Sequence, residues 1–270
     1  MEGLAAVVAA WRVRLREGRH PEQYAHLSRE SLAWVWRHRA LTPGYLVRYA
    51  RLLRLRLLHP DVVTHGMVFL GRGARVRTVP GYGRVHLGAF VHLGERTVLR
   101  AHEGMLRVGD KVVAGADVRV TCWLDVEVGD GTLLADWTYV ADFDHVHSDV
   151  ARPVKDQGIR KAPVRIGPGS WLGLRSAVLR GSDLGRGTVV AAHAVVRGAW
   201  PADVVLAGVP AVQVADRAER AARGTWPGAD LLAHDPALRP AAPPARGRGR
   251  RRARLRGRPV PPGSRPRRRG

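Results

Sequence analysis

Residues 142–149 bring together side chains that can move protons. The sequence DFDHVHSD places two histidines and three aspartates within eight positions. An imidazole is largely unprotonated near neutral pH and is basic enough to take a proton from a hydroxyl group. A carboxylate from Asp144 or Asp142 could hold the second ring nitrogen. The segment therefore predicts a general base that activates an alcohol, with His145 as the first candidate and His147 as its rival.

The polar segment continues as a charged loop, HSDVARPVKDQGIRKAP. Its long side chains can hydrogen-bond hydroxyl groups or carboxylates of a small molecule, although charge-rich loops are most often only solvated. We predict that the acceptor contacts lie here. The predicted acceptor-binding residues are His147, Lys155 and Gln157.

A six-residue repeat follows this loop. Aliphatic residues recur without a slip at Ile166, Leu172, Val178, Leu184, Val190 and Val196, and a small residue stands four positions after each of the first five. Three such repeats make one triangular coil, in which the aliphatic residue points inward and the small residue turns the corner. A less regular version of the repeat begins near Leu87. A β-sandwich would show a period of two, so we predict a parallel β-helix over residues 62–214.

A basic helical region precedes the repeat. After the turn signal Thr42-Pro43-Gly44, apolar residues recur at helical spacing, and arginines lie between them. The predicted apolar row consists of Leu46, Tyr49, Leu53 and Leu57. Such a helix can lie on anionic lipid or cover the open end of a neighbouring β-domain, and we favour the covering role.

The charge of the chain is concentrated at its C-terminal end. The 270 residues carry a formal net charge of +22, of which twelve arginines in residues 240–270 supply +12 and leave 22 − 12 = +10. That segment has no acidic residue and cannot build a core, so we expect it to be disordered. No aromatic side chain lies among its arginines to stack on bases, so no specific nucleic-acid partner is predicted. Weak contact with an anionic surface is the remaining interpretation.

The composition limits the compartment and the chemistry further. The single cysteine, Cys122, excludes a disulfide framework and a cysteine-built zinc site, and it fits a reducing compartment. The early apolar run Leu4–Trp11 is too short to span a membrane, and basic residues follow it instead of preceding it as in a signal peptide. We predict a cytoplasmic protein without a metal, with a peripheral membrane location as the alternative.

Residues 164–214 resemble the hexapeptide-repeat acyltransferases. The matching motifs are WLG at 171–173, AHAVV at 192–196 and AGVPA at 207–211. The upstream sequences DFDHVH and QGI resemble the members that modify sugar hydroxyls. The resemblance implies a mainly β fold, a left-handed parallel β-helix. The expected segments are a helical N-terminal segment (1–61), the β-helix (62–214), an extension (215–239) and the disordered tail (240–270).

The resemblance also implies an activity. Its members move an acyl group, usually acetyl, from coenzyme A to a hydroxyl group, and they are typically homotrimers with the donor in a groove between neighbouring β-helices. His145 stands where their loop histidine stands, and the backbone N–H of Leu174 is the implied oxyanion donor. The implied coenzyme-binding residues are Trp171, Gly173, Leu174, Ala192 and Arg197. We therefore expect transfer from acetyl-CoA to a sugar, glycan or other small hydroxylated acceptor.

A second interpretation belongs to another functional class. A β-helix can serve without catalysis, as a scaffold or binding protein anchored through its basic tail. A metal hydrase of the same fold is disfavoured, because the His-x-His spacing at 145–147 differs from the pattern associated with it.

Overall fold

The computed structural model describes residues 29–217 and residue 219. The early apolar run, most of the expected extension and the whole of the expected tail lie outside these residues.

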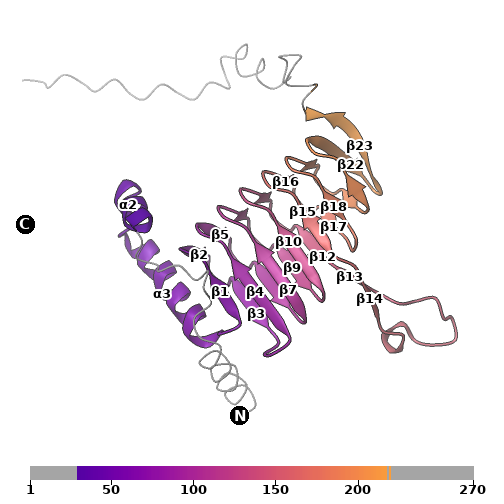
Figure 1. The fold of residues 1–270 in the computed structure, drawn as a ribbon, viewed down its shortest axis with the longest axis horizontal. Helices are drawn as coiled ribbons and strands as arrows, with labels where there is room; N and C mark the ends of the chain where they lie inside the picture. Colours follow the sequence, from indigo (N-terminus) through magenta and orange to yellow (C-terminus); the bar gives the residue numbers. More distant parts are fainter. Residues whose placement is uncertain (1–28, 218, 220–270) are drawn as a thin grey trace, which may run out of the picture. The chain divides into compact units, whose positions relative to one another are not determined.

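Three parallel sheets form the body of the described chain (Figure 1). Sheet A contains β1 (Val62–Thr64), β4 (Gly83–Leu87), β7 (Gly104–Val108), β10 (Asp125–Val128), β15 (Val164–Ile166), β18 (Asp183–Leu184) and β21 (Ala199–Trp200). Sheet B contains β2 (Val68–Leu70), β5 (Val91–Leu93), β8 (Val113–Ala114), β11 (Leu133–Leu134), β16 (Trp171–Leu172), β19 (Val189–Val190), β22 (Val204–Gly208) and β23 (Ala211–Asp216). Sheet C contains β3 (Arg75–Thr78), β6 (Val98–Ala101), β9 (Arg119–Cys122), β12 (Tyr139–Ala141), β17 (Ala177–Val178) and β20 (Val195–Val196).

The chain visits sheets A, B and C in turn, and each strand pairs in parallel with the strand one coil earlier. The final strand, β23, instead folds back antiparallel on β22. This is a β-helix, so the predicted mainly β fold is confirmed.

The six-residue repeat fills the interior of the coils. The repeat positions Ile166, Leu172, Val178, Leu184, Val190 and Val196 are each at most 2% exposed. The small residues of the repeat are buried as well, and the hydroxyls of three of them, Ser170, Ser182 and Thr188, donate to backbone carbonyls at the corners. Ser182 Oγ donates to the carbonyl oxygen of Leu179 at 2.6 Å, and Thr188 Oγ1 donates to that of Gly185 at 2.7 Å. The repeat therefore specifies both the apolar core and the satisfaction of corner carbonyls.

Within the described residues, two helices precede the coils: α2 (Arg29–Arg37) and α3 (Pro43–Leu58). Proline opens α3, where its missing N–H costs no hydrogen bond. The helix packs on β1 and β2, as predicted for a cover of the first coil. Of the predicted apolar row, Tyr49 contributes to this contact, with its ring centroid 6.4 Å from that of Phe69 in β2. The other three members of the row are exposed, and the buried residues of α3 are instead Leu52 and Leu55.

Within the described residues, no helix has both the length and the apolar character that crossing a membrane requires.

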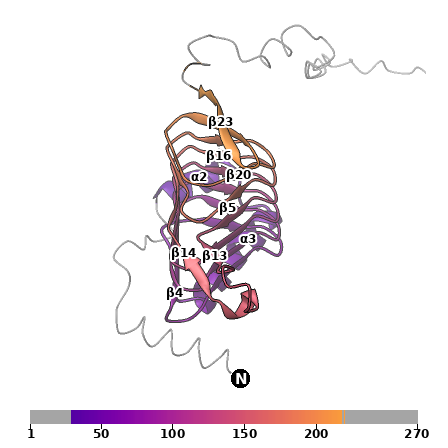
Figure 2. The same cartoon turned by 90° about the vertical axis from the view of Figure 1, so that its right-hand side faces the viewer.

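A hairpin leaves the coils between β12 and β15 (Figures 1 and 2). It consists of β13 (Phe143–His145), a 3₁₀ turn η1 (Val154–Asp156) and β14 (Ile159–Lys161), with β13 and β14 antiparallel. The ladder closes beneath it, because β10 pairs directly with β15 and β12 with β17. The insertion therefore projects the predicted histidines without breaking the stack of coils.

Candidate active site

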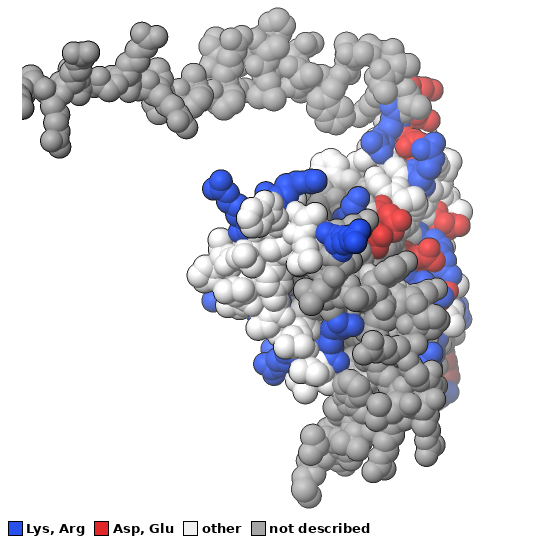
Figure 3. Space-filling model, turned by 60° about the vertical axis from the view of Figure 1, so that its left-hand side comes forward, with Lys and Arg blue, Asp and Glu red and all other residues white. Residues whose placement is uncertain are grey.

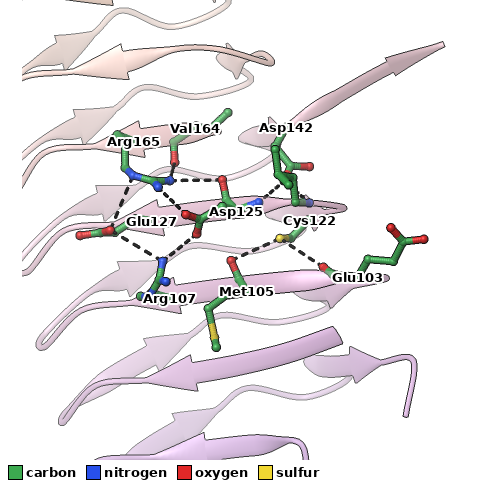
Figure 4. Close-up of polar contacts among 10 residues, drawn as sticks. Glu103, Met105, Arg107, Cys122, Asp125, Glu127, Asp142, Val164 and Arg165 are labelled. Atoms are coloured by element: carbon green, nitrogen blue, oxygen red, sulfur yellow. Dashed lines mark hydrogen bonds and ion pairs between the residues drawn. The ribbon is translucent and has the colours of Figure 1, made fainter. Parts of the chain in front are cut away.

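Asp142 anchors the root of the hairpin. Its side chain is fully buried, and its carboxylate accepts hydrogen bonds from the backbone N–H groups of Trp123 at 2.8 Å, Leu124 at 2.7 Å and Asp125 at 2.8 Å. These amides belong to the corner of the preceding coil, and Figure 4 shows Asp142 beside one of them, the amide of Asp125. The carbonyl oxygen of Asp142 also accepts from the N–H of Ala162 at 2.9 Å, which closes the root. The carboxylate is thus committed to the backbone and not to an imidazole.

Asp144 and His145 lie on opposite faces of β13, because successive side chains alternate along a strand. The Asp144 carboxylate lies 3.5 Å from Nε of Arg180 and 3.3 Å from Nη2 of Arg197. The structure therefore does not bring the predicted base and its predicted carboxylate partner together. The sequence did not predict this separation, because three residues are too few to show the alternating pattern of a strand.

His145 is exposed and packs against Phe143, which shares its face of β13. The two ring centroids are 6.1 Å apart at an interplanar angle of 78°, an edge-to-face contact. Phe143 in turn lies 5.8 Å from Trp123, and Trp123 stacks on His102 at 4.2 Å with the rings 11° from parallel. A row of rings thus runs through successive coils to the hairpin, a feature that the sequence analysis missed.

Burial lowers the pKa of His102 at the far end of this row, and nearby Arg100 lowers it further, against the opposing effect of Glu103. Lys161 of β14 holds its ammonium 5.4 Å from the Trp123 ring centroid and pairs with the Glu103 carboxylate. The base of the hairpin is therefore bound to the coils by rings on one face and by Asp144 on the other.

Gln157 braces the outer loop. Its side-chain oxygen accepts from the N–H of Asp149 at 3.0 Å, and its amide nitrogen donates to the carbonyl oxygens of Asp149 at 2.7 Å and Arg152 at 2.8 Å. Lys155 pairs with its neighbour Asp156 at 2.7 Å, and its side chain is 80% exposed. His147 is exposed as well. Both amide hydrogens of Gln157 are spent within the loop, so Lys155 and His147 are the more available of the three predicted acceptor contacts.

Four of the five residues implied for coenzyme binding lie together. Trp171 points outward from β16 and is 47% exposed, and Leu174 at the following corner is 42% exposed. A Cβ on Gly173 would lie 2.7 Å from the backbone nitrogen of Ala192 in the next coil, so glycine is required here by the stacking of the coils. Arg197 lies apart from these four, beside Asp144 at the root of the hairpin.

The backbone N–H of Leu174 differs from its equivalent two coils earlier, the N–H of Ala116. The N–H of Ala116 donates to the Asp136 carboxylate of the next coil at 2.8 Å. The register places Ala192 beside Leu174 as it places Asp136 beside Ala116, because Leu172 pairs with Val190 as Ala114 pairs with Leu134. Alanine offers no side-chain acceptor, so no aspartate is placed to accept a hydrogen bond from the Leu174 N–H.

The outer faces of sheets A and B have opposite character. On sheet A, Arg107 pairs with Asp125 at 2.6 Å, and Arg165 pairs with Asp125 and, at 3.7 Å, with Glu127 (Figure 4). Sheet B instead carries a row of outward apolar residues that pair in register. This row comprises Val113, Leu133 and Trp171, which are 41%, 43% and 47% exposed. Cross-strand ion pairs suit a solvated face, whereas the apolar row suits a contact surface.

No protein-family model matches the sequence. A Mycobacterium tuberculosis protein named as a probable acetyltransferase, Rv3034c, is 50% identical over 208 residues, which cover 77% of this chain and 68% of that protein. An Escherichia coli protein, WbbJ, whose name assigns it to O-acetyl transfer in lipopolysaccharide biosynthesis, is 32% identical over 176 residues, covering 61% of this chain and 88% of WbbJ.

The fold is also that of a solved structure, the polySia specific acetyltransferase NeuO. The two superpose with a TM-score of 0.51 at 18% sequence identity, over 58% of this chain and 71% of that one. The six-residue repeat, the stacked coils and the sequence relatives all indicate the same family. The chain belongs to the hexapeptide-repeat acetyltransferases, which share the left-handed parallel β-helix.

Proposed function

We propose that this acetyltransferase moves an acetyl group from acetyl-CoA to a hydroxyl group of a sugar or glycan acceptor, with His145 as the general base. The hairpin carries the proposal, because it sets an exposed imidazole outside an unbroken ladder of coils. The choice of a hydroxyl acceptor is supported by WbbJ, whose name refers to O-acetyl transfer.

The proposed reaction needs one proton carrier. The His145 imidazole takes the proton of the acceptor hydroxyl as its oxygen attacks the thioester carbonyl. A tetrahedral oxyanion forms and collapses, the carbon–sulfur bond breaks, and the departing sulfur of coenzyme A takes the proton back from the imidazolium. The products are an acetyl ester and free coenzyme A, and the imidazole returns to its neutral form.

Asp142 and Asp144 act as positioning residues in this proposal. Asp142 fixes the exit of the chain from the coils, and Asp144 fixes the outer face of β13 through Arg180 and Arg197. Because both faces of the strand are held, the edge-to-face contact with Phe143 restricts the orientation of the His145 ring. This revises the expectation that one of the two carboxylates holds the imidazole directly.

The donor site is proposed to include a second copy of the chain. The outward apolar row of sheet B supports packing between β-helices, and Trp171 lies within that row. A homotrimer would then place the hairpin of one copy against Trp171 and Leu174 of the next. The Leu174 N–H does not donate to an aspartate, so it is suited to donate a hydrogen bond to the developing oxyanion. Acetyl-CoA would lie along this groove past Gly173 and Ala192.

The proposal is tested by replacing each histidine separately in the purified protein. We expect His145→Ala to lower the rate of coenzyme A release with a sugar acceptor by about 10²–10⁴-fold, the usual contribution of a general base. The exposed neighbour is compared directly: His147→Ala, which removes a predicted acceptor contact, should raise the KM for the acceptor and leave kcat largely unchanged. Far-UV circular dichroism and coenzyme A binding should be unchanged in both variants.

The reverse pattern of losses would transfer the role to His147. Turnover that survives both substitutions would remove histidine catalysis by this hairpin from consideration. Coenzyme A binding is measured separately, so that an unsuitable acceptor is distinguished from a protein that does not bind the donor.

A further inference from the structure

The outward side of the two helices is apolar. On α3, Leu46, Leu53 and Leu57 are 52%, 60% and 54% exposed. On α2, Trp36 is 85% exposed and Leu32 is 54% exposed. Scattered apolar residues are normal on a protein surface, but a gathered set marks a surface that binds something. We refer to these five residues as the helical face.

A cavity of about 480 Å³ lies at this face. Its lining includes Leu32 and Val35 of α2, Leu53 of α3, and Met67, which precedes β2. Seven of the ten described lining residues are apolar, and the polar ones are Ser31, Tyr49 and Arg56. The size and character of the cavity suit a hydrocarbon chain.

Positive charge surrounds the helical face. Helix α3 contains four arginines and no aspartate or glutamate. A groove of about 510 Å³ beside α3 is lined by Arg51, Arg54, Arg75 and Arg77, and no acidic residue is among its described lining. Figure 3 shows this side of the molecule, with uncharged surface in white, arginine in blue around it, and the acidic residues in red lying away from it.

We propose that the helical face docks on an anionic phospholipid bilayer. Such a bilayer offers an apolar phase beneath a layer of negative charge and therefore satisfies both features at once. The leucines and Trp36 would enter the boundary between headgroups and acyl chains, while Arg54 and the groove arginines would contact phosphates. This inference is independent of the proposed acyl transfer, because it uses none of the residues placed in the active site.

Charge also disfavours a second copy of the chain as the occupant. Helix α3 has four arginines and no acidic residue, so two copies packed together through this helix would bring like charges into contact. A bilayer supplies the opposite charge instead.

The single cysteine makes a direct test available. Cys122 is buried, and burial, with Asp142 nearby, raises the pKa of its thiol to about 12, so the native thiol does not compete for a dye. Leu57→Cys in the full chain is labelled with an environment-sensitive fluorophore. Val150→Cys, at a position that is 101% exposed in the hairpin loop, is the matched control.

The probe is a vesicle of phosphatidylglycerol and phosphatidylcholine, compared with one of phosphatidylcholine alone. We expect a blue shift and an intensity gain for the dye at position 57 on the anionic vesicles only, and no shift at position 150. Binding of the arginines of residues 240–270 to anionic vesicles would not by itself change the emission, because such tethering leaves a dye at position 57 in water.

Charge is tested by a second pair of variants. Arg54→Glu should weaken the vesicle-dependent blue shift, whereas Arg119→Glu, on the outer face of β9, should leave it unchanged. An emission from position 57 that is unaltered by anionic vesicles would overturn the proposal. If that emission is already blue-shifted without vesicles, the helical face is covered by protein, and the bilayer proposal is excluded. A shift that depends on protein concentration would then indicate a second copy, and one that does not would indicate coverage by the same chain.

Discussion

Asp142 shows how a catalytic-looking residue can be a structural one. Its carboxylate is fully buried and takes three backbone N–H groups from the corner of the preceding coil. Sequence could place this aspartate beside two histidines, but it could not show where the carboxylate points. That depends on which backbone amides the coil one turn earlier leaves unpaired, a contact between residues 17 to 19 positions apart.

The substitution Asp142→Asn tests this role. The amide would set an N–H donor against one of the three backbone donors in a buried site, so we expect a loss of about 1–3 kcal/mol in the free energy of unfolding. Urea denaturation followed by circular dichroism measures it. Asp156→Asn, in the exposed loop, should change stability by less than about 0.5 kcal/mol. Equal stability of the two variants would contradict the anchoring role.

At the scale of elements, the repeat was predictable and the helix only in part. Each inward aliphatic residue of the coils recurs at one spacing, so the pattern identifies the buried side without further information. Helix α3 is apolar on more than one side, and periodicity does not reveal which side meets the solenoid. The same limit applies to β13, whose partner β14 lies beyond the hairpin loop and fixes the opposite directions of Asp144 and His145.

Two adjacent leucines of α3 provide a matched pair of variants that tests which side of the helix packs on the coils. Leu52 is 6% exposed against the first coil, and Leu53 is 60% exposed. We expect Leu52→Ala to cost about 2–5 kcal/mol, because it leaves a cavity beneath the helix. Leu53→Ala should cost less than about 0.5 kcal/mol, apart from a small gain in helix propensity. Urea midpoints of the two variants decide the matter, and the opposite order would mean that the helix docks through its other side.

At the scale of the whole described chain, stability should depend on pH through half-buried histidines. Burial lowers the pKa of His59, His92 and His102 below the ordinary value of 6.5, and arginines near each of them lower it further. The unfolded chain therefore takes up protons at a higher pH than the folded chain does. Stability is fully present above the unfolded pKa and declines as pH falls through it towards the folded values.

For this reason we expect the urea concentration at the midpoint of unfolding to decrease as the pH is lowered from about 7.5 to about 5.5. His92→Gln, which removes a ring that stacks on Phe69 at 4.4 Å, should lower stability at pH 7.5 but flatten its decline. His147→Gln, on the exposed loop, should leave the decline as it is. A midpoint that rises as the solution is acidified would show that other groups control the titration.

The closed ladder beneath the hairpin has a consequence for how such a protein can change. The chain leaves sheet C after Ala141 and returns to sheet A at Val164, and the coils on either side pair as though nothing had been inserted. The coils hold the insertion at its root, through the bond from Ala162 to Asp142, and along β13 and β14. The loop between those two strands, residues 146–158, can therefore change in length or sequence while the coils and His145 stay in place, so new acceptor preferences can arise from this loop alone.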